Sequence, residues 1–262
     1  MPDHSASTRT ALIVGAAGEI GTEVSTRLPQ LLGDSWLVRH ADLRADEAHG
    51  VASLDITDLD AYAGQCSGVD TLVHLAGERD SESGWERLHG PNVIGAHHAF
   101  EAARRAGCRR VVFASSVHVV LGHPIDTPLG ADTPPWPSTL YGATKVWGES
   151  LARLYADEED LSCLCLRIGW AGARDDRRKL RLPAARDMYL THDDAARLVA
   201  ACITAPDDVR FAALNAASAN TGSRFSIAET RRIVGYQPQD DAQELWSQLS
   251  EAVIRRGAHE PC

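Results

Sequence analysis

Lysine is nearly absent from this sequence of 262 residues, in which only Lys145 and Lys179 occur against 24 arginines. Lys145 follows Tyr141 by four positions, in the pattern Tyr-x-x-x-Lys. A compact ammonium can bond a ribose hydroxyl and lower the pKa of a neighbouring phenol, which a planar guanidinium does poorly. In so arginine-rich a chain, a lysine kept at this spacing indicates chemistry.

Long apolar runs and clusters of positive charge are also missing. No run of about 18 apolar residues occurs, so a membrane-spanning helix is not expected. Residues 1–9 are polar and lack the apolar core of a secretory signal, so we expect a disordered leader there. The formal net charge of −10 argues against a nucleic-acid partner, because phosphate binding needs clustered cations.

The cysteines and histidines lack the spacing of a metal or redox site. None of the six cysteines forms a paired motif with another. Without a secretory signal, this predicts a reduced, cytoplasmic protein. His97 and His98 have no carboxylate at ligand spacing, so no metal site is predicted.

Strand-like and helix-like segments alternate along the chain. Apolar runs predict strands at 10–14, 35–38, 51–54, 71–75, 111–114, 161–167 and 211–215. Helices are expected after the first strand as far as residue 28, and at 93–105, 140–155 and 192–204. Such repeated β-α-β units predict an α/β fold with a Rossmann-type, doubly wound parallel sheet of about seven strands.

We expect one domain over residues 10–247. Within it, irregular segments at about 169–190 and 217–240 are predicted to form a small C-terminal substrate lid, and residues 248–262 a tail.

A glycine-rich turn lies between the first expected strand and the first helix. Gly15, Gly18 and Gly21 leave room for the backbone to approach a pyrophosphate at the helix N-terminus. Asp42 lies 21 positions after Gly21, at the end of the second expected strand. The combination predicts a dinucleotide site.

Asp42 bears on which dinucleotide binds. A carboxylate at this place accepts hydrogen bonds from ribose hydroxyls and repels a 2′-phosphate, so NAD is favoured over NADP. Arg39 and Arg44 are nearby cations that would support NADP, or else solvated loop residues. Asp55, after the third strand, is placed either to contact the adenine amine or to cap the next helix.

Three residues are the candidate catalytic group. Tyr141 and Lys145 are one helical turn apart and therefore point to the same side. Ser116 follows the fifth expected strand, 25 residues before Tyr141. A hydroxyl there lies at the carboxyl end of the sheet, where ligands bind in open α/β folds. The phenol would act as general base toward an alcohol.

These motifs resemble those of the extended short-chain dehydrogenase/reductases, the NAD-dependent epimerase/dehydratase superfamily, over nearly the whole chain. The matching elements are Gly15-x-x-Gly18-x-x-Gly21, Asp42, Leu75-Ala76-Gly77, Asn92-x-x-Gly95, Ser116 and Tyr141-x-x-x-Lys145. Within the superfamily the chain looks most like uronate dehydrogenases, which oxidise the anomeric carbon of a hexuronate to an aldarolactone with NAD. The resemblance implies a Rossmann fold, a nicotinamide cofactor and Ser-Tyr-Lys catalysis. It also implies a homodimer, often built through two long helices, or a higher homo-oligomer.

Two sets of binding residues are predicted. The cofactor set is Gly15, Gly18, Glu19, Ile20, Gly21, Asp42, Arg44, Asp55, Ile56, Leu75, Ala76, Gly77, Asn92, Tyr141, Lys145 and Ile168. The substrate set is Arg79, Ser116, Val117, His118 and Trp170.

The chain departs from the uronate dehydrogenase pattern where a substrate would bind. Val117 stands in place of an asparagine, Trp170 in place of a serine, and Arg79 in place of a further serine. Fewer polar contacts and an added indole predict a less hydroxylated or more aromatic substrate. Arg79, Arg181 or Arg186 would still be able to clamp a carboxylate, unless they are solvated loop residues.

The predicted function is that of an NAD-dependent oxidoreductase acting on a CH–OH group of a small polar substrate. It is either uronate-dehydrogenase-like or a ketoreductase on a related cyclic substrate. The alternative is a nucleotide-sugar epimerase or dehydratase, although Val117-His118 stands where dehydratases have Asp-Glu. A non-catalytic NAD-sensing regulator is a third hypothesis, against which the retained Tyr141 and Lys145 argue.

Overall fold

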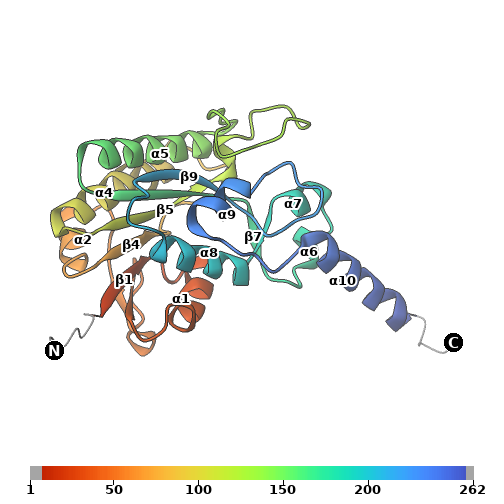
Figure 1. Ribbon diagram of the computed structural model, residues 1–262, viewed down its shortest axis with the longest axis horizontal. Coiled ribbons are helices and arrows are strands. Elements are labelled where there is room, and N and C mark those ends of the chain that lie inside the picture. Colours follow the sequence, from red (N-terminus) through yellow and green to blue (C-terminus); the bar gives the residue numbers. More distant parts are fainter. Residues whose placement is uncertain (1–7, 258–262) are drawn as a thin grey trace.

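Seven parallel strands form the central sheet in the computed structural model, which describes residues 8–257 and the side chains of residues 8–251 (Figure 1). Their order is β3-β2-β1-β4-β5-β6-β9. The strands are β1 (Arg9–Val14), β2 (Trp36–Asp42), β3 (Val51–Ser53), β4 (Thr71–His74), β5 (Arg110–Ser116), β6 (Ser162–Ile168) and β9 (Phe211–Ala216). Each predicted strand is present, and the predicted fold class is confirmed.

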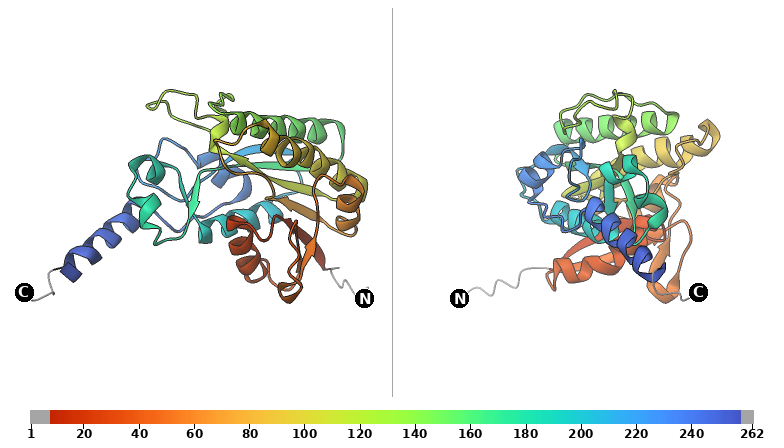
Figure 2. Two further views of the ribbon diagram at one scale, coloured as in Figure 1. Left: turned by 180° about the vertical axis from the view of Figure 1, so that it is seen from behind. Right: turned by 90° about the vertical axis from the view of Figure 1, so that its right-hand side faces the viewer.

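Helices cover both faces of this sheet. The helices of the described chain are α1 (Glu19–Leu32), α2 (Leu59–Gln65), α3 (Trp85–Leu88), α4 (Gly95–Ala106), α5 (Leu140–Glu158), α6 (Arg177–Leu180), α7 (Pro183–Asp187), α8 (His192–Thr204), α9 (Ala228–Val234) and α10 (Ala242–Gly257). Helices α1 and α8 pack together on one face, and α2, α4 and α5 lie on the other (Figures 1 and 2).

Burial on both faces explains why the strands are nearly continuous apolar runs. On the α1 and α8 face, Ile13 and Val73 of the sheet pack with Leu28 and Leu198. On the other face, Leu72 belongs to the same apolar cluster as the ring side chains of α2 and α4. The sheet is thus packed between two layers of helices, which fix the positions of the residues at the carboxyl ends of its strands.

The chain changes direction of winding between β1 and β4. From β1 it first runs outward through β2 and β3, and then returns to place β4 on the other side of β1. In open α/β sheets, a crevice for ligands opens at the carboxyl ends of the strands at such a switch point. The predicted glycine turn follows β1 at this position.

Helix caps set the start of the helices that matter for the site. Thr139 Oγ1 accepts a hydrogen bond from Gly142 N at 3.0 Å, so α5 begins immediately before Tyr141. Thr191 Oγ1 accepts one from Asp194 N at 3.2 Å, so α8 begins at the predicted residue. Both follow the rule that a hydroxyl or carboxylate satisfies the free N–H groups of the first turn.

The lid segments and the tail are more regular than the sequence predicts. Residues 169–190 contain α6, α7 and a separate two-stranded parallel sheet of β7 (Trp170–Gly172) and β8 (Tyr189–Thr191). Residues 217–240 contain α9, and 248–257 continue α10. Strands of three residues and helices of four are too short to show a periodic pattern.

Helix α4 begins later than the sequence predicts. A π-helical segment (His89–Ile94) precedes α4, so the helix predicted from residue 93 begins two residues later.

The first seven residues of the predicted leader lie outside the described residues, whereas Arg9 belongs to β1. In the described part of the chain, no helix has both the length and the apolar character to cross a membrane.

Candidate active site

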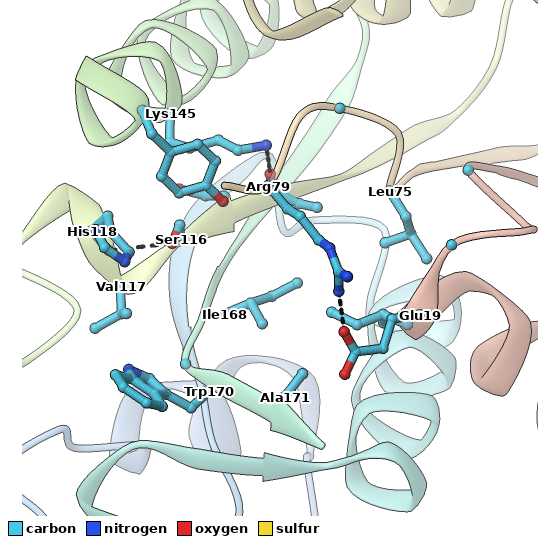
Figure 3. A pocket seen from close by; sticks show the side chains of 18 of the residues that line it. Glu19, Leu75, Arg79, Ser116, Val117, His118, Lys145, Ile168, Trp170 and Ala171 are labelled. Carbon is cyan, nitrogen blue, oxygen red and sulfur yellow. Dashed lines mark hydrogen bonds and ion pairs between the residues drawn. The ribbon is translucent and has the colours of Figure 1, made fainter. Parts of the chain in front are cut away.

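Two adjoining cavities form one groove along the carboxyl ends of the strands. The glycine turn and the loop after β4 line both of them, through Gly15, Gly18, Leu75, Gly77 and Glu78. One cavity extends toward the end of β2, and the other toward β5, α5 and β7, which Figure 3 shows. The groove therefore has the extended form that a dinucleotide requires.

The glycine turn fits closely against the loop after β4. Gly15 has a φ of +91°, and a Cβ there would lie 2.6 Å from Ala76 N. A Cβ at Gly21 would lie 1.9 Å from Gly15 O. Neither position tolerates a side chain, which is the property needed for backbone N–H groups to approach phosphate at the start of α1.

Asp42 ends β2 and faces the first cavity. Its Oδ2 accepts a hydrogen bond from Ala17 N at 3.0 Å, and its Oδ1 one from Arg44 N at 3.3 Å. Arg44 and Ile56 also line this cavity. Arg39 does not line it, because its guanidinium donates to Gln65 O and Ser67 O instead.

Asp55 lines the same cavity, but local hydrogen bonds hold its carboxylate. Its Oδ1 accepts from Thr57 N at 2.9 Å and from Thr57 Oγ1 at 2.7 Å, which lowers the pKa of Asp55. The cap of α2 is Asp58, whose Oδ1 accepts from Ala61 N. Asp55 therefore orders the turn before α2, and Asp58 caps the helix.

Ser116, Tyr141 and Lys145 meet in the second cavity. Ser116 ends β5, and the other two come from the first turns of α5. Lys145 Nζ donates to Ala114 O at 2.9 Å, and burial lowers the pKa of this lysine to about 8. All three side chains are at least nine-tenths buried, so few rotamers are open to them.

The pKa of Tyr141 is raised in the protein alone, whereas the predicted lowering concerns a phenol that lies beside both an ammonium and a bound nicotinamide. Burial raises it, a hydrogen bond with Ser116 lowers it, and the charge of Glu78 raises it further. Lys145 Nζ lies 5.7 Å from the Tyr141 ring centroid and points to a backbone carbonyl. In the protein alone, desolvation of the phenol therefore outweighs the hydrogen bond with Ser116.

A buried ion pair that the sequence analysis missed lies beneath these residues. Arg167 of β6 and Glu149 of α5 form two hydrogen bonds of 2.9 Å, with side chains 4% and 7% exposed. Ser115 Oγ donates to Glu149 Oε1 at 2.7 Å. The network ties the ends of β5 and β6 to α5. Glu149 follows Lys145 by four positions, which is the only signal in the sequence that puts it on the same helix face.

Asn92 stands apart from the other predicted cofactor residues. Its side-chain amide accepts from Glu78 N and donates to Glu78 O and Thr144 Oγ1, at 2.8, 3.0 and 3.2 Å. It is buried and lines neither cavity. Asn92 therefore fastens the loop after β4 to α5.

The predicted substrate residues all line the second cavity. Val117 is buried, whereas the Trp170 side chain on β7 is more open. The ring of His118 meets Tyr141 edge-on at 5.4 Å between centroids, and its Nδ1 is buried without a partner. Burial lowers the pKa of His118, which favours its neutral form. Arg79 is not a free cation, because it is paired with Glu19 (Figure 3).

Lys179 is the functional candidate that the sequence analysis left unassigned. It lies in α6, lines the second cavity, and places Nζ 3.0 Å from Glu19 Oε1. Arg181 and Arg186 do not line the cavity, and Arg186 donates to Gln243 and Leu180 O. Lys179 is one of only two lysines in the sequence, and this rarity is the signal that points to it.

Of the two predicted lid segments, only the first reaches the groove. Gly169, Trp170, Ala171 and Lys179 line the second cavity, whereas no residue of 217–240 lines either one.

Comparison with known proteins identifies the family. The model of the NAD dependent epimerase/dehydratase family matches residues 11–186. An L-arabinose 1-dehydrogenase (NAD(P)(+)) of Haloferax volcanii is 32% identical, over 88% of this chain and 96% of its own. A uronate dehydrogenase of Agrobacterium fabrum is 31% identical, over 92% and 88%. A uronate dehydrogenase from Agrobacterium tumefaciens, solved in complex with NAD, superimposes with a TM-score of 0.80 at 31% identity, over 93% and 89%. This chain belongs to the NAD dependent epimerase/dehydratase family.

Proposed function

We propose that the protein is an NAD-dependent oxidoreductase that acts on a CH–OH group of a small sugar, in the manner of a uronate dehydrogenase. The observation that carries this proposal is the convergence of Ser116, Tyr141 and Lys145 on a cavity that adjoins the glycine turn. Two relatives that align over most of both chains are sugar dehydrogenases, which favours this function over an epimerase or a regulator.

The glycine turn and Asp42 would hold the dinucleotide. The turn presents backbone N–H groups at the start of α1, and the Asp42 carboxylate is positioned for ribose hydroxyls. That carboxylate also disfavours a 2′-phosphate, which supports NAD over NADP. Ile168, Leu75 and Ala76 line the groove along its length. When bound, NAD supplies the site that accepts or returns a hydride.

The remaining chemistry belongs to the side chains. Ser116 Oγ is placed to hydrogen-bond the reacting oxygen, and the Tyr141 phenol to take or return its proton. Lys145 is an ammonium at neutral pH, since its pKa is about 8. It supplies positive charge beside the phenol and a donor for a ribose hydroxyl. His118 closes the cavity beside Tyr141 as a neutral ring.

The charged residues around the cavity favour an acidic sugar as the substrate. The relatives are also consistent with a neutral sugar. Arg79 and Lys179 both line the cavity, and each can donate to a carboxylate. The names of the relatives, a uronate dehydrogenase and an L-arabinose 1-dehydrogenase, point to one sugar of each kind. We assign hexuronate oxidation to the lactone as the first reaction to test.

A panel of sugars tests the proposal. Purified protein with NAD is offered D-glucuronate, D-galacturonate, L-arabinose and D-glucose, and NADH formation is followed. We expect turnover of at least one sugar, and a loss of about 10²- to 10⁴-fold in kcat for Tyr141→Phe with NAD binding retained. Binding of NAD without turnover of any sugar would count against this substrate class.

We also propose that the protein is a cytoplasmic homodimer, associated through α4 and α5. Support comes from the outer face of α5, where Trp147 and Leu154 are 42% and 53% exposed. The two side chains lie two helical turns apart on α5, and apolar side chains grouped on one helix face favour a surface that a partner covers. Light scattering of the purified protein tests this, and Leu154→Glu is expected to yield monomers.

A further inference from the structure

Glu19 is the first residue of α1, directly after Gly18 of the glycine-rich turn, and two cations from distant segments meet on it. Arg79 of the loop after β4 pairs with Glu19 Oε2, and Lys179 Nζ of α6 lies 3.0 Å from Glu19 Oε1. Figure 3 shows Arg79 reaching across the cavity to this carboxylate. We call Glu19, Arg79 and Lys179 the mouth bridge.

The mouth bridge consists of the same two cations that would attract an acidic substrate. Both line the cavity of Ser116 and Tyr141, as does Glu19 itself. Burial raises the pKa of Glu19, but hydrogen bonds and charges from Lys179 and Arg79 outweigh it, so the net pKa is lowered. The carboxylate is therefore ionised at neutral pH and occupies both cations.

The surrounding groups do not replace Glu19 in this role. Asp176 Oδ2 lies 3.7 Å from Lys179, but it also caps α6 by accepting from Lys179 N. His192 lies 3.9 Å from Glu19. Glu78, the other carboxylate of the cavity, is paired with Arg87.

We propose that Glu19 is a specificity-determining residue, which acts as an internal anion that an acidic substrate must displace from Arg79 and Lys179. The inference rests on the proposed function and concerns the charge of the sugar that the site accepts. A neutral sugar enters without disturbing the bridge. An acidic sugar brings a second carboxylate to the same two cations, and repulsion between the two carboxylates lowers its affinity.

The exposure of the bridge makes this exchange feasible. The side chains of Glu19, Lys179 and Arg79 are 35%, 22% and 75% exposed. Ion pairs with this much solvent contact are weak and readily rearranged. Glu19 thus lowers the affinity for acids by a modest factor and does not abolish their binding.

Glu19→Gln tests the proposal, because it removes the charge and keeps the size of the side chain. The readout is the ratio of kcat/KM for D-galacturonate to that for D-galactose, which differ only in carboxylate against hydroxymethyl. We expect the ratio to rise by about three- to tenfold. Glu23→Gln is the matched control, one turn further along α1, where Glu23 pairs with Arg27 and does not line the cavity. An unchanged ratio in Glu19→Gln, or an equal rise in Glu23→Gln, would overturn the proposal.

A binding measurement separates this proposal from the proposed function. D-galacturonate is titrated by calorimetry, with NAD present, into the Tyr141→Phe variant and into the same variant that also carries Glu19→Gln. We expect the second protein to have a Kd about three- to tenfold lower than the first. This result supports the proposal even if no sugar is turned over. Equal affinity, or no binding by either protein, would overturn it.

Discussion

The floor and the mouth of the candidate active site both contain opposite charges, but in different surroundings. The floor consists of Lys145, Glu149 and Arg167, which are all less than one-tenth exposed. The mouth bridge has a guanidinium that is 75% exposed and joins three segments far apart in the chain. Each region contains one of the only two lysines.

This difference in burial determines how easily the charged groups of each region can change partners. A buried charge without its partner is costly, so the floor has one stable arrangement and positions Tyr141 and Ser116. An exposed pair contributes little to stability, so the mouth can exchange partners. Fixed geometry suits the reacting group, and exchangeable contacts suit the recognition of a substrate.

The two lysines should differ most in activity. We expect Lys145→Met to lower kcat/KM by about 10²- to 10⁴-fold, because it removes the cation beside the phenol. Lys179→Met should cost about tenfold or less, and only for acidic sugars. Steady-state kinetics with an acidic and a neutral sugar measure both. Comparable losses for the two variants would contradict the distinction between floor and mouth.

The next largest effect is expected on stability. Glu149→Gln leaves the Arg167 charge without its buried partner and should lower the free energy of unfolding by about 3–5 kcal/mol. Asp157→Asn is a matched control on the same helix, where Arg153 and Asp157 form a pair 60% and 50% exposed. It should cost at most about 1 kcal/mol. Urea denaturation gives both values, and similar losses would refute the assigned difference.

The burial of Lys145 should also appear in the pH dependence of stability. Its pKa is lowered from 10.5 to about 8 by burial, so between these values the unfolded chain holds a proton that the folded protein has released. Unfolding free energy therefore gains a contribution that rises with pH across this window. Lys145→Met should lose that rise, whereas Lys179→Met should keep it. Denaturation curves at several pH values test this, and an unchanged slope in Lys145→Met would contradict it.

The smallest expected effect is that of salt on the KM for an acidic sugar. Raising ionic strength from about 0.05 to 0.5 M screens exposed charges more than buried ones. We expect KM for an acidic sugar to rise by about two- to threefold, with little change for a neutral sugar. Equal salt sensitivity for both sugars would show that the mouth cations do not contact the substrate carboxylate.

Local patterns accounted for much of the fold. Apolar runs located all seven strands of the central sheet, and Thr191 located the start of α8. The secondary structure of residues 169–190 was not predicted, because β7, β8 and α6 are too short to show a periodic apolar pattern. These elements form only where they pack on one another. Residues that close a short turn, such as Asp55 with Thr57, also take roles that spacing does not reveal.

By itself, the sequence determined the parallel sheet, the glycine turn and the Ser116, Tyr141 and Lys145 group. These depend on neighbours a few positions apart, such as one helical turn or one strand end. Only the tertiary structure decided that Glu149 pairs with Arg167, that Asn92 fastens a loop, and that Lys179 and Arg79 meet on Glu19. Those partners are distant in the chain, and packing of the sheet and its lid brings them within hydrogen-bonding distance.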